Sequence, residues 1–179
     1  MRKLKNKELN RLSTEEFKRA KKLPVVLVLD DIRSAMNVGS AFRTADAFGV
    51  EKVYLCGITA TPPHREINKT ALGAQDSVNW EYEKFIGLCL KRLKKEGYQL
   101  VAVEQADEST SLIDFQVNEG ERYAFVFGNE VFGVNDDVVE NVDTVLEIPQ
   151  YGTKHSLNIS VCVGVILWDL LSKKMKLHS

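Results

Sequence analysis

The chain has 179 residues, of which 44% are hydrophobic and 27% are charged, a length and composition typical of one soluble globular domain. No apolar run approaches the roughly 18 residues of a membrane-spanning helix, and no apolar stretch follows the basic N-terminus as in a signal peptide. The three cysteines are far apart and have neither metal-ligand nor redox-motif spacing, which suits a reducing compartment. We therefore expect a cytoplasmic protein without a membrane partner.

Charge is unevenly distributed along the sequence. Residues 1–24 contain nine Lys or Arg and three Glu, an excess of six positive charges on a chain whose net charge is −1. A basic segment attached to an acidic body favours local binding of a polyanion. A solvated amphipathic helix explains the same pattern equally well.

Helical and strand patterns alternate along the chain. The first helix is predicted over Thr14–Lys22, with Ser13 as its N-cap and Pro24 after its end. Five short, nearly continuous apolar runs predict strands of a parallel sheet covered on both faces: Val25–Leu29, Val53–Cys56, Gln99–Val103, Tyr123–Phe127 and Thr144–Ile148. Further helices are predicted from apolar spacing over Val38–Phe48, Glu83–Glu96, Asp136–Asn141 and Ile159–Leu171.

This alternation predicts an α/β fold, a three-layer parallel sheet, over residues 25–179, preceded by a basic helical extension over residues 1–24. Residues 57–80 show no clear pattern and are predicted to form a long irregular loop, either functional or disordered.

Unusual residues follow three of the predicted strands, and ligands of open parallel sheets bind at the carboxyl ends of the strands. The residues are Asn37, Gly39 and Arg43 after the first strand, Gly128, Asn129, Glu130 and Gly133 after the fourth, and Gly152, Ser156, Asn158 and Ser160 after the fifth. A tight turn and a helix cap explain each segment alone. Together they indicate a binding site.

Several common sites are absent from the sequence. There is no GxGxxG or GxxxxGK[ST] phosphate-binding loop and no GxSxG nucleophile elbow. The histidines and cysteines lack the spacing of metal ligands, so no metal is expected. The remaining Asn, Ser, Arg and Glu side chains suit binding and positioning more than covalent catalysis.

Three segments together resemble the motifs of the SpoU (TrmH-like) RNA 2′-O-methyltransferases, in that family's order. The segments are NVGSAFRTA from Asn37, FGNEVFG from Phe127 and IPQYGTKHSLNISV from Ile148. One departure is Gln150, where the family commonly has an apolar residue such as Met. The resemblance implies an α/β fold with a C-terminal deep trefoil knot, a homodimer, and S-adenosylmethionine as the cofactor bound in the knotted loops.

The resemblance also implies roles for individual residues. Arg43 would be the central catalytic residue, Asn37 would orient it or the ribose, and Glu130 would fix that arrangement. Ser156 and Asn158 would position cofactor and substrate. The matching cofactor-binding positions are Glu104, Gly128, Ile148, Ser156 and Leu157. A guanidinium pKa above about 12 makes Arg43 a poor base, so binding a phosphate costs less free energy than accepting a proton. The alternative in which Arg43 accepts the proton stays open.

The substrate implied by the resemblance is RNA. Many ribosomal RNA members carry an N-terminal RNA-binding domain, whereas only about 24 residues precede the first predicted strand here. Short members with basic ends include tRNA enzymes that methylate a D-loop guanosine, so tRNA is favoured over ribosomal RNA.

Two other classes remain as alternatives. A catalytically idle RNA-binding protein of the same fold would be expected to have lost Arg43, Asn37 or Ser156, and all three are present. A nucleotide-dependent oxidoreductase would be expected to carry the glycine fingerprint that this sequence lacks.

Overall fold

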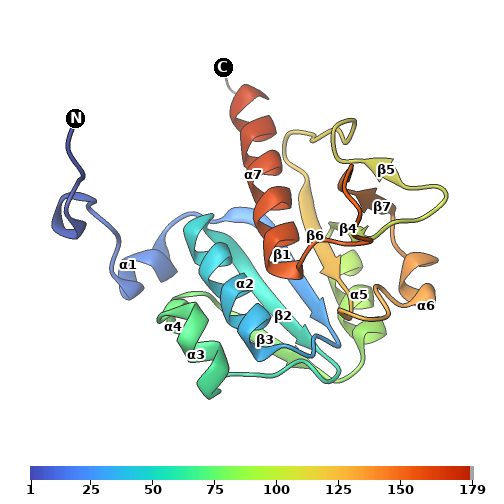
Figure 1. Cartoon of the computed structure of the whole chain (residues 1–179), viewed down its shortest axis with the longest axis horizontal. Coiled ribbons are helices and arrows are strands. Elements are labelled where there is room, and N and C mark those ends of the chain that lie inside the picture. Colours follow the sequence, from blue (N-terminus) through green and yellow to red (C-terminus); the bar gives the residue numbers. More distant parts are fainter. Residues whose placement is uncertain (178–179) are drawn as a thin grey trace.

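The computed structural model describes residues 1–177, so the last two residues of the predicted domain lie outside the described part. Seven parallel strands form one sheet in the order β3-β2-β1-β6-β4-β7-β5, with helices on both faces (Figure 1). The α/β class and the parallel sheet predicted from sequence are confirmed. Within residues 1–177, no helix is long and apolar enough to cross a membrane.

The strands are β1 (Leu23–Asp30), β2 (Val50–Cys56), β3 (Trp80–Glu83), β4 (Tyr98–Val103), β5 (Thr110–Ser111), β6 (Arg122–Phe127) and β7 (Thr144–Glu147). The helices are η1 (Asn6–Glu8), α1 (Thr14–Arg19), α2 (Ala35–Ala47), α3 (Arg65–Ala71), α4 (Ala74–Ser77), α5 (Ile86–Lys95), α6 (Asp136–Val139) and α7 (Ile159–Leu177). All five predicted strands are present, with ends shifted by up to three residues.

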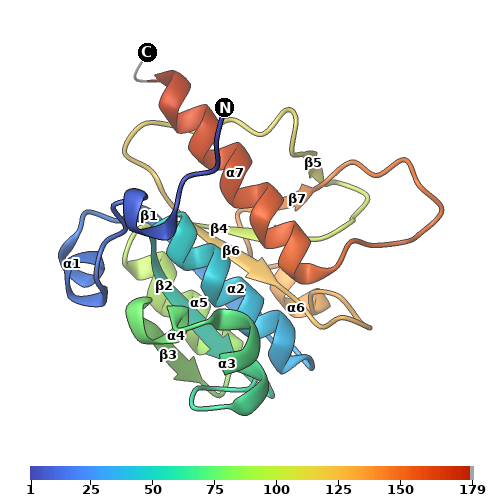
Figure 2. The same ribbon diagram turned by 60° about the vertical axis from the view of Figure 1, so that its left-hand side comes forward.

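The central strand β1 shows why these runs form a sheet covered on both faces. From Val25 to Asp30 every residue is buried, and alternate side chains enter two different cores. Val25, Leu27 and Leu29 pack with residues of α2, α3 and α7, whereas Val26 and Val28 pack with α5 and α6. Figure 2 shows α2 and α7 crossing the same face of the sheet.

The close packing of α2 against α3 depends on Gly39. A Cβ atom at this position would lie 2.1 Å from the Thr70 hydroxyl and 2.4 Å from the Ile67 carbonyl oxygen. The sequence placed this glycine in a candidate binding segment, and in the structure it makes room for a neighbouring helix.

The structure differs from the sequence predictions in several elements. The predicted loop over residues 57–80 holds α3 and α4 and reaches the start of β3, so that prediction is wrong. The helix predicted from Glu83 begins at Ile86, because residues 80–83 instead pair with β2. The helix predicted to end at Leu171 continues to the last described residues, and α1 ends at Arg19 rather than Lys22.

The N-terminal segment lies beside the sheet rather than over it (Figure 1). Ser13 caps α1 as predicted and forms a capping box with Glu16. α1 contacts α4, and Phe17 packs against the main core, while residues 1–5 and 7–12 are exposed. The extension therefore consists of an arm, residues 1–12, and the short helix α1, which packs against the rest of the fold.

Candidate active site

The site forms where β1, β6, β4 and β7 end at one edge of the sheet. Loops after these four strands carry all three motif segments, and β6 lies between β1 and β4. The chain order reverses here, since β2 and β3 lie on one side of β1 and the later strands lie on the other. Such a switch point is where open α/β sheets bind ligands.

Glu130 connects the second motif to the first. Its carboxylate accepts hydrogen bonds from the backbone N–H of Arg33 at 2.8 Å, from that of Ser34 at 3.0 Å and from the Asn37 side-chain amide at 3.0 Å. Burial acts to raise the pKa of Glu130, but these bonds outweigh it and lower the pKa below its ordinary value. Glu130 is therefore an ionised acceptor that fixes the start of α2.

Asn37 extends this connection to the third motif. Its carbonyl oxygen accepts a bond of 3.2 Å from the Asn158 amide, and the Asn158 oxygen accepts from the N–H and hydroxyl of Ser160. One chain of hydrogen bonds thus joins Glu130, Asn37 and Asn158, three of the five residues predicted to be catalytic.

A tight hairpin holds Glu130 in place. Asn129 and Gly133 exchange two backbone bonds of 2.9 and 2.8 Å, and the Asn129 side chain accepts from the N–H groups of Val131 and Phe132. The Asn129 amide also donates to the Asp31 carbonyl at 2.8 Å. The hairpin leaves no room at Gly128, where a Cβ atom would lie 2.2 Å from the Gly133 carbonyl oxygen.

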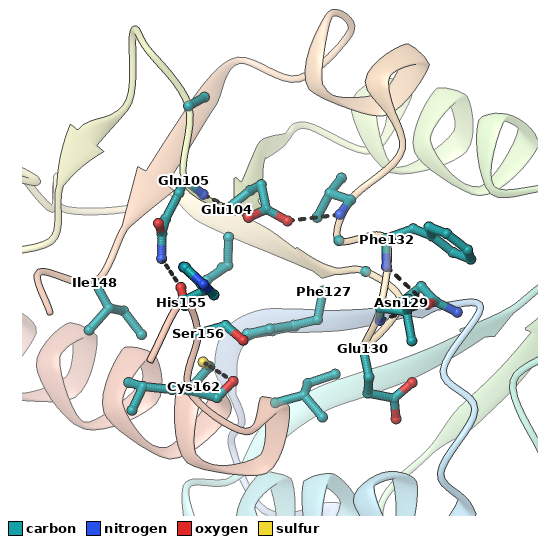
Figure 3. A pocket seen from close by; sticks show the side chains of 18 of the residues that line it. Glu104, Gln105, Phe127, Asn129, Glu130, Phe132, Ile148, His155, Ser156 and Cys162 are labelled. Atoms are coloured by element: carbon teal, nitrogen blue, oxygen red, sulfur yellow. Dashed lines mark hydrogen bonds between the residues drawn. The ribbon is translucent and has the colours of Figure 1, made fainter. Parts of the chain in front are cut away.

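Glu104, at the end of β4, holds the far side of this hairpin. Its carboxylate accepts from the backbone N–H of Val134 at 2.9 Å and from that of Gln105 at 2.8 Å. Gln105 in turn donates its side-chain amide to the His155 carbonyl at 2.7 Å, which ties the loop before α7 to β4 (Figure 3). Glu104 has a structural role besides any contact with a ligand.

These loops enclose a cavity of about 700 Å³. Nine of the residues predicted for the site line it: Glu104, Gly128, Asn129, Glu130, Gly133, Ile148, Ser156, Leu157 and Asn158. Figure 3 shows Ile148, Ser156 and Phe127 around its interior, with Glu104 and Gln105 along one side. All five predicted cofactor-binding positions are therefore gathered in one cavity.

Asn37 lines a shallow, open depression of about 310 Å³ together with Arg33, Ser34 and Glu130, and this depression is called the small cavity below. Glu130 is the residue that the two cavities share. It therefore lies at the border between the two.

Arg43 lies outside both cavities. It is exposed on α2, six residues beyond Asn37, and its side chain makes no hydrogen bond or ion pair with any described residue. The part of the chain that the structure describes thus leaves this guanidinium free to meet a group outside the chain.

Sequence reasoning missed Arg33, Gln105 and Cys162. Arg33 lines the small cavity, whereas Gln105 and Cys162 line the large one. The position of Gln105 directly after Glu104, at a strand end, could have indicated it. Cys162 lies in the first turn of α7 and has no signal in the sequence beyond its neighbours in the third motif.

Comparison with known proteins identifies the family. Residues 24–168 match the model of the SpoU rRNA Methylase family. The chain belongs to this family. The relationship predicted from the three motifs is therefore confirmed.

Named relatives act on two kinds of RNA. The chain is 30% identical over 152 residues to the tRNA (guanosine(18)-2′-O)-methyltransferase of Borreliella burgdorferi, covering 85% of this chain and 68% of that enzyme. It is 31% identical over 144 residues to the 23S rRNA (guanosine-2′-O-)-methyltransferase RlmB of Neisseria meningitidis, covering 80% of this chain and 56% of that enzyme. These names agree with the predicted enzyme class, RNA 2′-O-methylation.

The fold has a close match among solved structures. The TrmH/SpoU tRNA modifying enzyme of Aquifex aeolicus superposes with a TM-score of 0.80 at 26% identity, covering 91% of this chain and 83% of that one. The AdoMet-bound rRNA methyltransferase of Sinorhizobium meliloti shares the fold, with a TM-score of 0.78 at 23% identity over 87% of this chain and 59% of that one.

Proposed function

We propose that this protein is an S-adenosylmethionine-dependent RNA 2′-O-ribose methyltransferase that acts on tRNA. The observation that carries the proposal is the hydrogen-bonded chain Glu130–Asn37–Asn158, which joins all three motifs beside the large cavity. Family membership agrees with this reaction class. The transfer needs a ribose hydroxyl aligned with a methyl donor and relieved of its proton.

The large cavity fits the cofactor in size and chemistry. Its volume of about 700 Å³ lies within the range of small-molecule sites, and Leu146, Ile148 and Leu157 give it an apolar wall that suits an adenine ring. Each Glu104 oxygen accepts one N–H bond and retains capacity for a ligand hydroxyl. When bound, S-adenosylmethionine supplies a methyl group carried on a positively charged sulfur.

Asn37 is suited to hold the target ribose. An amide side chain has two N–H donors and two acceptor lone pairs. Asn37 uses one donor on Glu130 and one lone pair on Asn158, so one of each remains. A hydroxyl both donates and accepts, and it can satisfy both. The lowered pKa of Glu130 makes it a weak base, so we assign it to positioning rather than proton removal.

Arg43 is proposed to act on the RNA rather than on the cofactor. It lines neither cavity and is exposed, so its planar guanidinium can grip a phosphate that arrives with the substrate. Ser156, exposed on the loop before α7, would contact the cofactor or the ribose from the opposite side.

The tRNA assignment follows relatives named for tRNA guanosine 18, from Borreliella burgdorferi at 30% identity and from Aquifex aeolicus at 32% identity. The arm also exposes Lys3, Lys5, Lys7 and Arg11, which can contact phosphates. The basic C-terminal helix contributes less, because Lys173 pairs with Asp169 at 2.7 Å.

We further propose a homodimer that packs through α7. Val161, Trp168 and Met175 are 48%, 65% and 66% exposed, and their spacing of seven places them in one stripe along the helix. Exposed apolar stripes of this kind mark interaction surfaces. A second copy of the same stripe is a matching partner for it.

We also propose that the chain forms the deep trefoil knot, that residues 25–179 make up the methyltransferase domain, and that the protein is cytoplasmic. The knot is supported by the path of residues 148–158. They lead from β7, two strands beyond β6, to α7, which packs on α2. The Gln105 bond to His155 holds this segment across the end of β4.

The decisive experiment is methyl transfer from labelled S-adenosylmethionine to unmodified bulk tRNA and to ribosomal RNA, tested separately and followed by digestion to nucleosides. A 2′-O-methylated nucleoside from tRNA alone is expected. Label in ribosomal RNA alone would refute the tRNA assignment. Bound cofactor without label in either RNA would favour the idle RNA-binding protein.

A further inference from the structure

We propose that Arg33 binds a backbone phosphate of the RNA beside the target ribose, as a positioning residue distinct from Arg43. The inference rests on the proposed function, since it assumes an RNA substrate at Asn37. It assigns the small cavity of about 310 Å³, lined by Arg33, Ser34, Asn37 and Glu130, to the sugar–phosphate of the target nucleotide.

The first step in the argument is that the Arg33 backbone is fixed. Its N–H donates to the Glu130 carboxylate at 2.8 Å, and the next residue, Ser34, donates to the same carboxylate and caps α2. The side chain therefore begins from a defined point at the edge of the cavity.

The second step is that the guanidinium has no partner of its own. Within residues 1–177, it makes no hydrogen bond or ion pair, and the residue is exposed. The Glu130 carboxylate accepts from two backbone N–H groups and from Asn37, and the Arg33 bond to it comes from the backbone N–H. All five N–H donors of the guanidinium remain available to a ligand.

The third step is that the small cavity needs a cation to accept RNA. Glu130 places a negative charge there, and this charge opposes an approaching phosphate. Arg43 does not line this cavity, so Arg33 is the arginine placed to offset that charge. Asn37 keeps one donor and one acceptor for a ribose hydroxyl, and the planar Arg33 guanidinium suits the phosphate beside it.

The test compares Arg33→Ala, Arg33→Lys and a control, Lys91→Ala, with the wild-type chain. Lys91 is an exposed cation on α5, which covers the opposite face of the sheet. RNA affinity is measured at several salt concentrations, alongside kcat, KM for RNA, S-adenosylmethionine affinity and melting temperature. The RNA is whichever one the wild-type chain methylates, or bulk tRNA if it methylates neither.

For Arg33→Ala we expect KM and Kd for RNA to rise about 10-fold or more and the salt slope to fall by about 1, with cofactor affinity and melting temperature unchanged. Arg33→Lys should keep the slope and recover part of the affinity, because the charge remains while the fork is lost. Lys91→Ala should match the wild type.

An unchanged salt slope in Arg33→Ala would overturn the proposal. So would a loss of cofactor affinity or of melting temperature equal to the loss of activity, since Arg33 would then act through the fold. Failure of the proposed function is a separate result, seen as a wild-type chain that methylates no RNA. In that case the dependence of RNA affinity on salt concentration still decides the role of Arg33.

Discussion

The side-chain amide of Asn37 donates a 3.0 Å hydrogen bond to the carboxylate of Glu130, 93 residues further along the chain. The bond fixes the start of α2 against the hairpin after β6, so a residue expected to hold the substrate is positioned by one that also borders the cofactor cavity. A change in either residue should therefore disturb the geometry of transfer before it disturbs binding.

Glu130→Gln should lower kcat by about 100-fold while melting temperature at neutral pH falls by a few degrees, because the amide nitrogen of Gln cannot accept from Arg33 or Ser34. The pKa of Glu130 is lowered in the folded protein, so its stabilising effect is present above the ordinary carboxyl pKa and is lost as pH falls through the folded value. Thermal melts over a series of decreasing pH should show a difference that is full at pH 7 and shrinks as the pH falls below the ordinary carboxyl pKa. Glu140→Gln, at an exposed site that ends α6, is the control.

Arg43→Ala should reduce methyl transfer by at least about 100-fold and leave the free energy of unfolding within about 0.5 kcal/mol of wild type. The side chain is exposed and makes no hydrogen bond or ion pair among the described residues that unfolding would lose. Cofactor affinity, measured by calorimetry, should not change, because Arg43 lies outside the large cavity. Retained turnover would remove Arg43 from the chemistry.

Deletion of residues 1–12 should weaken RNA binding and reduce its dependence on salt. The deletion removes exposed cations but keeps Ser13, whose capping box holds α1. Each lost phosphate contact should lower the slope of log affinity against log salt by about 0.7 to 0.9. The control is the double variant Lys91→Ala, Lys95→Ala, which removes two exposed cations from α5. An unchanged slope would make the arm a solvated segment.

Trp168→Glu should convert the proposed dimer to a monomer. The substitution places a charge in the middle of the apolar stripe of α7, where its desolvation in an interface is unfavourable. Sedimentation velocity at micromolar concentration measures the outcome. Leu88→Glu, at a 54% exposed position on α5, should leave the mass unchanged. A wild-type chain that is monomeric would contradict the interface.

Asp30→Asn should raise the melting temperature at pH 8 by a few degrees and have little effect at pH 4. Burial and the neighbouring charge of Asp31 raise the pKa of Asp30 to about 6. Wild-type stability therefore falls as pH rises from the ordinary carboxyl pKa through about 6, because the buried group must ionise. The amide removes that cost. Asp107→Asn, at an exposed loop position, should show no such pH dependence.

Four of the five strands that sequence predicted are largely buried, and β7, with one buried residue of four, is the exception. β1 and β6 are apolar along nearly their whole length because helices cover both faces, and this leaves a plain signal in composition. β3 and β5 were missed because they lie at the two edges of the sheet and are only partly buried. Their structure comes from backbone pairing with a neighbour, which the sequence does not display.

The site was predictable as a set of loops but not as a set of contacts. Carboxyl ends of parallel strands meet at one edge, so the three motif segments had to gather there. Which side chain bonds to which depends on atomic positions across 93 and 121 residues of chain, as for Asn37 with Glu130 and with Asn158. Arg33 was overlooked for this reason, since only the fold shows that it borders a cavity.

The position of β6 in the sheet has a consequence for how the protein is made. β6 joins β1 on one side and β4 on the other, yet both neighbours leave the ribosome before it. Until Phe127 has emerged, β1 and β4 each expose an edge of apolar strand with unpaired backbone groups. A nascent chain of this protein is therefore open along the middle of its sheet for most of its synthesis, and that edge is where a chaperone would bind and where aggregation would begin.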